Sequence, residues 1–241
     1  LEAQGVRQAI DCVDWPNEFP YKPITSFYIA RDKECLYINY FVKGNYLRAV
    51  NSTDNSPVWE DSCVEFFVQI PGEKYYYNFE FNCIGTALAA RRTGREDAEH
   101  FSADKMAKIK RYSSVGNKPF CEMEGLFSWN LLVAIPFELI GLDGGQLPES
   151  LSANFNNFDL TPPSFGHLPY ILRCKTQGRR VIVTLRLNSP RPFSSVSLAT
   201  SPPDKGGIGV CAFACILIPS PFSPYCYRNF PQCYETRQGG G

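Results

Sequence analysis

The sequence predicts an all-β protein, an antiparallel β-sandwich, over residues 1–155. Three observations predict this fold. Short apolar segments alternate with polar positions at a period of two, turn residues separate these segments, and Tyr and Phe, which favour strands, number 13 and 18. Repeated short strands with regular turn signals are typical of sandwiches and barrels. Residues 156–241 do not follow this pattern.

The expected strands, in chain order, are residues 26–32, 35–42, 62–70, 75–85, 108–115, 127–135 and 150–155. The first two form a hairpin around Asp32-Lys33, and the third and fourth are joined by the turn Pro71-Gly72. Residues 135–142 form a single helical turn that begins at Pro136, a residue favoured at this position. A short helix is expected within 95–108.

Two neighbouring strands carry opposite chemistries on their two faces. In residues 62–70, the side chains of Val64, Phe66 and Val68 point into the core, so Glu65 points to the other face. In residues 75–85, one face holds Tyr77, Phe79 and Phe81, and the other holds Tyr76, Asn78, Glu80 and Asn82. Trp15 and Trp129 are expected to pack in the core.

Composition excludes several classes of partner. Lys and Arg together number 24, as do Asp and Glu, so the formal charge is zero. This balance argues against nucleic acid or an anionic membrane as a partner. No apolar stretch reaches the roughly 20 residues of a membrane span. The chain starts at Leu1, so a leader can be missing, and the compartment stays open.

Of the ten cysteines, the first five are isolated and lack the CxxC or His-linked spacing of a zinc site. The first five lie in apolar contexts, where a cysteine often serves as a small buried residue. Cys63 and Cys83 are candidates for a cross-strand bridge, which the sequence leaves undecided.

A break in composition near residue 155 separates two halves. Residues 1–155 hold 15 basic and 21 acidic side chains, a charge of 15 − 21 = −6, and residues 156–241 hold 9 and 3, a charge of +6. The second part is rich in Pro, Ser and Cys, although 179–187 and 207–218 have the pattern of strands. We hypothesise that this tail is an out-of-frame or mis-joined segment, which the DNA reading frame around codon 155 would decide.

The polar positions of the two strands favour a neutral polyol as ligand. Carboxylates accept hydrogen bonds from hydroxyl pairs, and amides both accept and donate. Trp59, six residues before Glu65, offers a flat ring to the CH face of a sugar. Phosphate fits poorly, because only Arg91 and Arg92 are close in sequence and no Gly-rich loop is present. A solvated sheet face is the alternative interpretation of the same residues.

Five ordered motifs resemble the family 9 carbohydrate-binding modules, in particular the family 9-like domains of Bacteroidetes. They are DCVDWPNEFPYKP (11–23), VWEDSCVEFF (58–67), YYNFEFNCIGTAL (76–88), WNLLVAIPFELIG (129–141) and SANF (152–155). The resemblance covers residues 9–155. It implies a non-catalytic β-sandwich that holds a sugar end between two aromatic rings.

The resemblance also implies the residues of the site. Trp59 and Glu65 match the family's spacing, Asn154 matches an Asn on the last strand, and Arg91 is a loose match to an Arg. Structural calcium is a family property for which no ligands are assigned, and no other cofactor is expected. The implied partners are plant-type oligosaccharide or polysaccharide ends, in a bacterial protein of polysaccharide utilisation that can be linked to glycoside hydrolases.

The chain departs from the family after residue 155, since no Trp follows Trp129. Phe155, Phe158 or Phe165 would have to replace the second aromatic wall. Three further functions stay open: an interaction domain that has lost its sugar site, a glycoside hydrolase that uses Glu65 and Glu80, and a haem module. The last of these would take its ligands from Met106, Met123 and His100.

Overall fold

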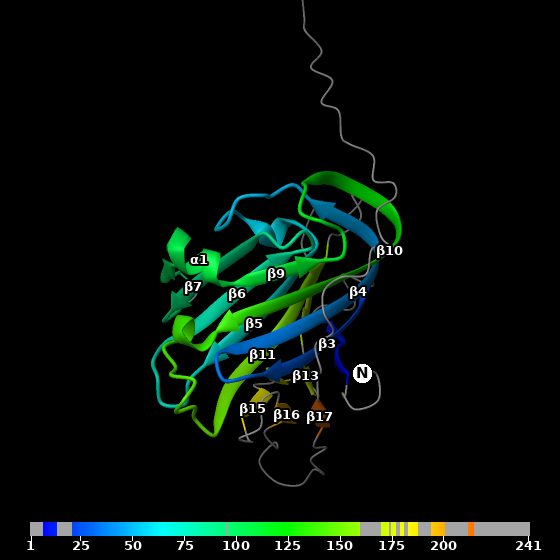
Figure 1. Ribbon diagram of the computed structural model, residues 1–241. Coiled ribbons are helices and arrows are strands. Elements are labelled where there is room, and N and C mark those ends of the chain that lie inside the picture. The colour runs from blue at the N-terminus through cyan, green and yellow to red at the C-terminus, as the bar shows by residue number, and fades with distance from the viewer. Residues whose placement is uncertain are drawn as a thin grey trace, which may run out of the picture.

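Antiparallel pairing joins most strands of the protein into one continuous path that folds back on itself as a sandwich (Figure 1). The computed structural model describes residues 7–13, 21–94, 96–159, 170–173, 175–176, 179–180, 183–187, 194–200 and 212–214. All pairs of strands within these residues are antiparallel, which confirms the all-β sandwich predicted from the sequence. Trp15 and Phe165 lie outside the described residues.

The first sheet has five strands in the order β1, β3, β4, β10 and β9. Their bounds are β1 (Gln8–Ile10), β3 (Ile24–Arg31), β4 (Cys35–Ala49), β10 (Phe120–Pro136) and β9 (Lys110–Ser113). Asp32 closes the β3–β4 turn, because its carboxylate accepts the backbone N–H groups of Glu34 and Cys35 at 2.8 and 2.7 Å. This is the hairpin expected around Asp32-Lys33.

The second sheet runs in the order β8, β7, β6, β5, β11 and β15. Their bounds are β8 (Ala98–His100), β7 (Ala87–Arg92), β6 (Tyr76–Asn82), β5 (Cys63–Gln69), β11 (Ser150–Asp159) and β15 (Val183–Arg186). β12 (Tyr170–Arg173) pairs with β11 and with β2 (Cys12–Val13). β16 (Ser194–Thr200) joins this sheet to β3 and pairs with β17 (Ala212–Ala214), whereas β13 (Lys175–Thr176) and β14 (Arg179–Arg180) pair separately.

Three strands extend well beyond their expected ends, and several strands, among them β7 and β8 of the second sheet, were not expected. β4 continues to Ala49 and β10 begins at Phe120, so the two form a long ribbon with register shifts around Gly125, whose φ is 154°. β11 continues to Asp159. β7 was missed because its sequence is rich in Ala, a weak strand former, and only burial between neighbours makes it a strand.

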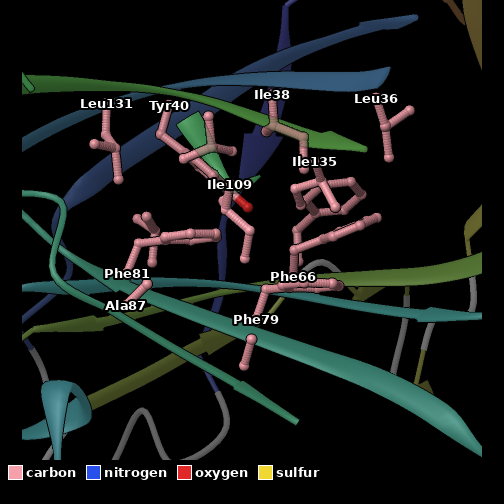
Figure 2. Close-up of a cluster of buried hydrophobic side chains, with 14 of the residues drawn as sticks. Leu36, Ile38, Tyr40, Phe66, Phe79, Phe81, Ala87, Ile109, Leu131 and Ile135 are labelled. Carbon is pink, nitrogen blue, oxygen red and sulfur yellow. The ribbon is translucent and has the colours of Figure 1, made fainter. Parts of the chain in front are cut away.

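The core fills the space between the two sheets, as Figure 2 shows. Side chains such as Ile38 and Leu131 reach down from β4 and β10, and Phe66 and Phe79 reach up from β5 and β6. Phe27 of β3 stacks on Phe155 of β11 with ring centroids 3.9 Å apart, which joins the layers. The core roles expected for the listed residues are confirmed: Val64, Phe66, Val68, Tyr77, Phe79, Phe81 and Trp129 are all buried.

Helical structure is limited to three short elements in the described residues. They are the 3-10 turns η1 (Val58–Glu60) and η2 (Phe137–Ile140) and the helix α1 (Ala103–Lys108). η2 follows Pro136 and α1 lies within 95–108, as expected. None of the described helices has the length and apolar character needed to cross a membrane.

Candidate functional site

The side of the second sheet that faces away from the core carries a set of aligned polar residues, called here the polar face. Its members are Glu65, Asn78, Glu80, Asn82, Arg92, Asn154 and Asn156. The strand register sets them side by side in rows. One row runs Asn156–Glu65–Glu80, and the next places Phe67 between Asn154 and Asn78. Four neighbouring strands therefore contribute to one surface.

Each carboxylate of the central row is held by an amide. Asn156 Nδ2 donates to Glu65 Oε2 at 2.9 Å, and Asn78 Nδ2 donates to Glu80 Oε1 at 3.0 Å. Both carboxylates are buried, with Glu65 3% and Glu80 6% exposed. The solvated sheet face that the sequence left as an alternative is therefore wrong for these residues, which form a buried floor.

Three buried oxygens of this floor have no hydrogen-bond donor among the residues that the structure describes. They are Asn78 Oδ1, Glu80 Oε2 and Asn156 Oδ1. Most buried polar groups in proteins are hydrogen-bonded, and leaving one unpaired costs about 1–3 kcal/mol. These three oxygens belong to neighbouring strands of the polar face, so the described residues leave a group of acceptors unpaired in one part of the sheet.

The electrostatics of the floor are governed by burial. Burial raises the pKa of Glu80 from its ordinary 4.5 to about 7, and the positive charge of Arg92 opposes this rise. Burial likewise raises the pKa of the Cys63 thiol, with the charges of Glu65 and Glu80 acting in the same direction. The floor therefore penalises negative charge, which disfavours an anionic ligand.

Trp59 stands at one end of the polar face on η1. Its neighbour Val58 is buried against Cys63 and Leu88, both of which point from the polar side of the sheet, so η1 lies over this end of the floor. Trp59 itself is 39% exposed, an unusual value for so large an aromatic residue. Its ring is thus available for contact beside a buried polar floor.

The segment that carries Trp59, residues 50–62, is called here the Trp59 loop. Asp61 fixes its two ends, because its carboxylate accepts the backbone N–H groups of Val50 and Asn51, each at 3.0 Å, and Asn82 Nδ2 at 2.9 Å. Arg48 Nε lies 3.4 Å from Asp61 Oδ1. The Asp61 side chain is fully buried.

The middle of the Trp59 loop is fixed to the neighbouring strands. The Asp54 carboxylate accepts hydrogen bonds from two guanidinium nitrogens of Arg111, at 2.6 and 3.0 Å, and from the backbone N–H of Ala87, at 3.0 Å. Asn55, at a φ of 63°, donates to the carbonyl of Phe101 and accepts from Ala89. Asn tolerates this left-handed backbone better than most residues. These hydrogen bonds hold the Trp59 loop in one conformation.

At the other end of the polar face, Phe67 and Tyr76 form a half-buried aromatic pair with centroids 6.2 Å apart. Half-buried Asn154 lies beside Phe67 across the β5–β11 pairing. Together with Trp59 they form a partly accessible rim around the buried floor.

The register separates the site residues expected from the sequence into two groups. Five of them lie on the polar face: Glu65, Asn78, Glu80, Asn82 and Asn154. Arg91 does not, because it pairs with Tyr77 on the opposite side of β7, where it bonds Glu99 and lies over the ring of Tyr75.

Arg92 is the arginine of the polar face, and Asn156 is a further member that the sequence did not predict. Arg92 pairs with Tyr76, which shares the side of Asn78 and Glu80. Asn156 was missed because the strand was expected to end at residue 155. The continued alternation of Asn154 and Asn156 was the signal that could have revealed it.

Both the nitrogen and the oxygen of the Asn82 side-chain amide form hydrogen bonds within the protein. Its Nδ2 donates to Asn51 O and Asp61 Oδ2, at 2.7 and 2.9 Å, and its Oδ1 accepts from Thr86 N at 2.9 Å. It therefore braces the Trp59 loop.

The structure corrects one further expectation, on Phe155, and answers one open question, on the Cys63–Cys83 bridge. Phe155 is a fully buried core residue that stacks on Phe27 and packs against Phe66 at a tilt, so it is no second aromatic wall. The side chain of Phe158 is not among those described. The Cys63–Cys83 bridge is absent, because Cys63 is a free thiol on the polar side whereas Cys83 lies in the main core.

Metal ligands do not gather in the part of the chain that the structure describes: it contains no group of three or more His, Cys, Asp or Glu placed to hold an ion. Met106, one of the haem ligands considered, is buried in the core.

Comparison with known proteins shows which family the sequence and the fold resemble. The sequence profile of carbohydrate-binding family 9 matches residues 2–158. The crystal structure of a candidate carbohydrate-binding protein from Bacteroides uniformis has 35% identity and a TM-score of 0.63, covering 73% of this chain and 80% of that one. No curated protein matched the chain.

A family 9 module from Caldicellulosiruptor kristjanssonii, solved in complex with glucose, has 12% identity and a TM-score of 0.42, and covers 70% of this chain and 74% of that one. Its complex with cellotriose has 12% identity and a TM-score of 0.35, with coverages of 63% and 66%.

Proposed function

The chain belongs to carbohydrate-binding family 9, and on that premise we propose that its polar face binds a sugar or the end of an oligosaccharide without catalysing a reaction. In this proposal, Trp59 stacks on the ligand. Five polar side chains line the binding site: Glu65, Asn78, Glu80, Asn154 and Asn156. Arg92 takes the role that the sequence had assigned to Arg91. Asn82 positions the Trp59 loop.

The observation that carries the proposal is the group of three buried oxygens that have no donor within the described part of the chain. Sugar hydroxyls supply donors in adjacent pairs, and strands lie about 4.8 Å apart with same-face residues about 6.6 Å apart, dimensions close to those of one sugar ring. A hydroxyl bound to such an oxygen replaces an unfavourable unpaired group with a hydrogen bond. A neutral ligand also suits a floor that penalises added negative charge.

The rim supports the same ligand class. Trp59 presents its apolar ring at the edge of the floor, where it can cover the CH face of a pyranose. Phe67 and Tyr76 extend the apolar rim at the other end of the floor. We propose plant-type oligosaccharide or polysaccharide ends as the ligands, and a glycoside hydrolase as the activity that the binding serves.

The geometry of the two carboxylates argues against catalysis by this chain itself. Glycosidases place two carboxyl groups on either side of the scissile bond. Glu65 and Glu80 project from the same face of neighbouring strands, so both meet a ligand from one side. Each of these carboxylates also accepts a hydrogen bond from an asparagine amide. We expect no turnover of aryl glycosides by the wild-type protein, and turnover that Glu65→Gln abolishes would contradict this view.

The binding proposal is tested with a glycan array followed by calorimetry on the strongest hit. Trp59→Ala should weaken binding by about 30-fold, since a dominant aromatic contact contributes about 2 kcal/mol. The variant should remain folded, because Trp59 is partly exposed. Tyr112→Ala is the matched control, since Tyr112 is an exposed aromatic of β9 in the first sheet.

Two results would overturn the proposal. The first is a wild-type protein that binds nothing on the array. The second is equal affinity of the wild-type protein and folded Trp59→Ala, which would place the sugar elsewhere on the molecule.

A further inference from the structure

Two partly accessible rings, Phe67 and Tyr76, border the buried floor and are called here the aromatic pair. Phe67 follows Glu65 by two residues on β5, so its side chain lies on the same face about 6.6 Å farther along the strand. Tyr76 of β6 lies beside it, with ring centroids 6.2 Å apart and ring planes at 46°. Both rings are half-buried, whereas Glu65 and Glu80 are 3% and 6% exposed. The accessible surface next to the floor is therefore aromatic.

Hydrogen-bonding groups flank the aromatic pair. Asn154 lies across the β5–β11 pairing from Phe67, and its Oδ1 accepts the backbone N–H of Phe155 at 2.8 Å, which leaves its Nδ2 as a donor. Gln69 is the next residue of β5 on this face. Its Nε2 donates to the carbonyl of Glu73 at 2.9 Å, which leaves its Oε1 as an acceptor. A half-buried donor and a half-buried acceptor therefore stand beside the two rings.

The aromatic pair is continuous with the floor, and this continuity identifies its occupant. Trp59 stands over the level of Cys63, and Phe67 lies four residues farther along β5, a separation of about 13 Å. This distance exceeds one pyranose ring and accommodates two linked rings. Resting on the sugar-binding role proposed above, we infer that Phe67 and Tyr76 form a second subsite, which holds the sugar unit next to the one on the floor. The ligand class is therefore a linear oligosaccharide of at least two units, in preference to a monosaccharide.

The chemistry of a sugar unit matches this second subsite. A pyranose presents CH groups on its face, which pack against aromatic rings, and hydroxyl and ring oxygens at its edge. Its oxygens can accept from Asn154 Nδ2, and its hydroxyls can donate to Gln69 Oε1. The aromatic pair is also preformed, because the Tyr76 hydroxyl donates to the carbonyl of Gly94 at 3.4 Å and its ring contacts Phe67. A ligand therefore binds without having to order these rings, which favours affinity.

The inference is tested by calorimetry with two series of ligands: glucose, cellobiose and cellotriose, and xylose, xylobiose and xylotriose. In a series that binds, the disaccharide should bind about tenfold more tightly than the monosaccharide. The trisaccharide should bind less than about threefold more tightly than the disaccharide, since its third unit lies beyond both subsites. Equal affinities for the monosaccharide and the disaccharide would overturn the inference while leaving sugar binding intact.

Phe67→Leu removes one ring but keeps an apolar side chain. It should reduce the advantage of the disaccharide to less than about threefold and leave the affinity for the monosaccharide within about twofold of wild type. Tyr76→Leu removes the other ring and should act in the same way, so it provides the same measurement if Phe67→Leu does not fold. Phe41→Leu is the matched control and should keep the wild-type ratio, because Phe41 is a half-buried aromatic on the outer side of the first sheet, 5.6 Å from Tyr28.

Trp59→Ala separates failure of the inference from failure of the proposed function. Trp59 stacks on the unit over the floor, so its loss should weaken the monosaccharide and the disaccharide by the same factor, unlike Phe67→Leu. If Phe67→Leu also weakens both ligands equally, or leaves their ratio unchanged, Phe67 belongs to no separate subsite and the inference is wrong. If neither series binds to the wild-type protein, the sugar-binding proposal fails for these ligands and the second subsite fails with it.

Discussion

Asp61 is the residue whose removal should most clearly test how the Trp59 loop is held. Its buried carboxylate accepts the N–H groups of Val50 and Asn51 and the amide of Asn82, and it faces Arg48. Asp61→Ala leaves these buried donors without their acceptor. Structurally, the variant separates the two ends of the loop while leaving the core untouched.

The magnitude follows from the contacts. A hydrogen bond to a charged group contributes about 1.5–3 kcal/mol, and such contributions are not additive within one network. Breaking a buried charged network by removing one member typically costs about 3–5 kcal/mol. We therefore expect Asp61→Ala to lower the free energy of unfolding by about 3–5 kcal/mol. For a domain of this size the melting temperature should fall by roughly 6–20 °C.

Urea unfolding followed by far-UV circular dichroism measures the first quantity and differential scanning calorimetry the second. Asp61→Asn should lose less, about 2 kcal/mol, because it keeps one acceptor oxygen but turns an amide donor toward a backbone donor. Glu60→Ala is the control, since Glu60 is the exposed neighbour on η1, and it should change stability by less than about 0.5 kcal/mol.

The same variants connect stability to the proposed function. Asp61→Ala should weaken sugar binding at a temperature where it is still folded, because Trp59 loses its fixed position. An unfolding free energy within about 1 kcal/mol of wild type would refute the reasoning, since the four contacts would then contribute little.

Three further predictions concern the core, the floor and the loop. Phe155→Ala should lower the free energy of unfolding by about 3–5 kcal/mol, measured by urea unfolding, because it removes a fully buried ring packed against two others. Glu80 binds its proton more tightly when folded, so its contribution to stability is fully present below pH 4.5 and is lost as pH rises through about 7. The shift of 7 − 4.5 = 2.5 units corresponds to on the order of 3 kcal/mol, and unfolding of Glu80→Gln from pH 4 to 8 should lack this slope. Arg111→Ala should cost about 2 kcal/mol by the same assay, since it leaves a half-buried Asp54 carboxylate without its bidentate partner.

Much of the fold could be predicted from the sequence because the period of two is a local property. Val64, Phe66 and Val68 are apolar at alternate positions, so their burial and the outward direction of Glu65 follow from strand geometry alone. Strand ends and the Ala-rich β7 could not be predicted in the same way. Whether such residues continue a strand depends on pairing with partners far along the chain.

The residues of the candidate site also fall into those that the sequence could predict and those that it could not. The sequence by itself determined which residues of β5 and β6 share the polar face, because alternation assigns each residue to one face of its own strand. Only the tertiary structure decided that Arg92 and not Arg91 joins them, and that Asn156 reaches Glu65 from β11. It also showed that Glu65 and Glu80 are buried rather than solvated. The physical reason is that register and burial are set by contacts between strands, and one strand's sequence carries no record of them.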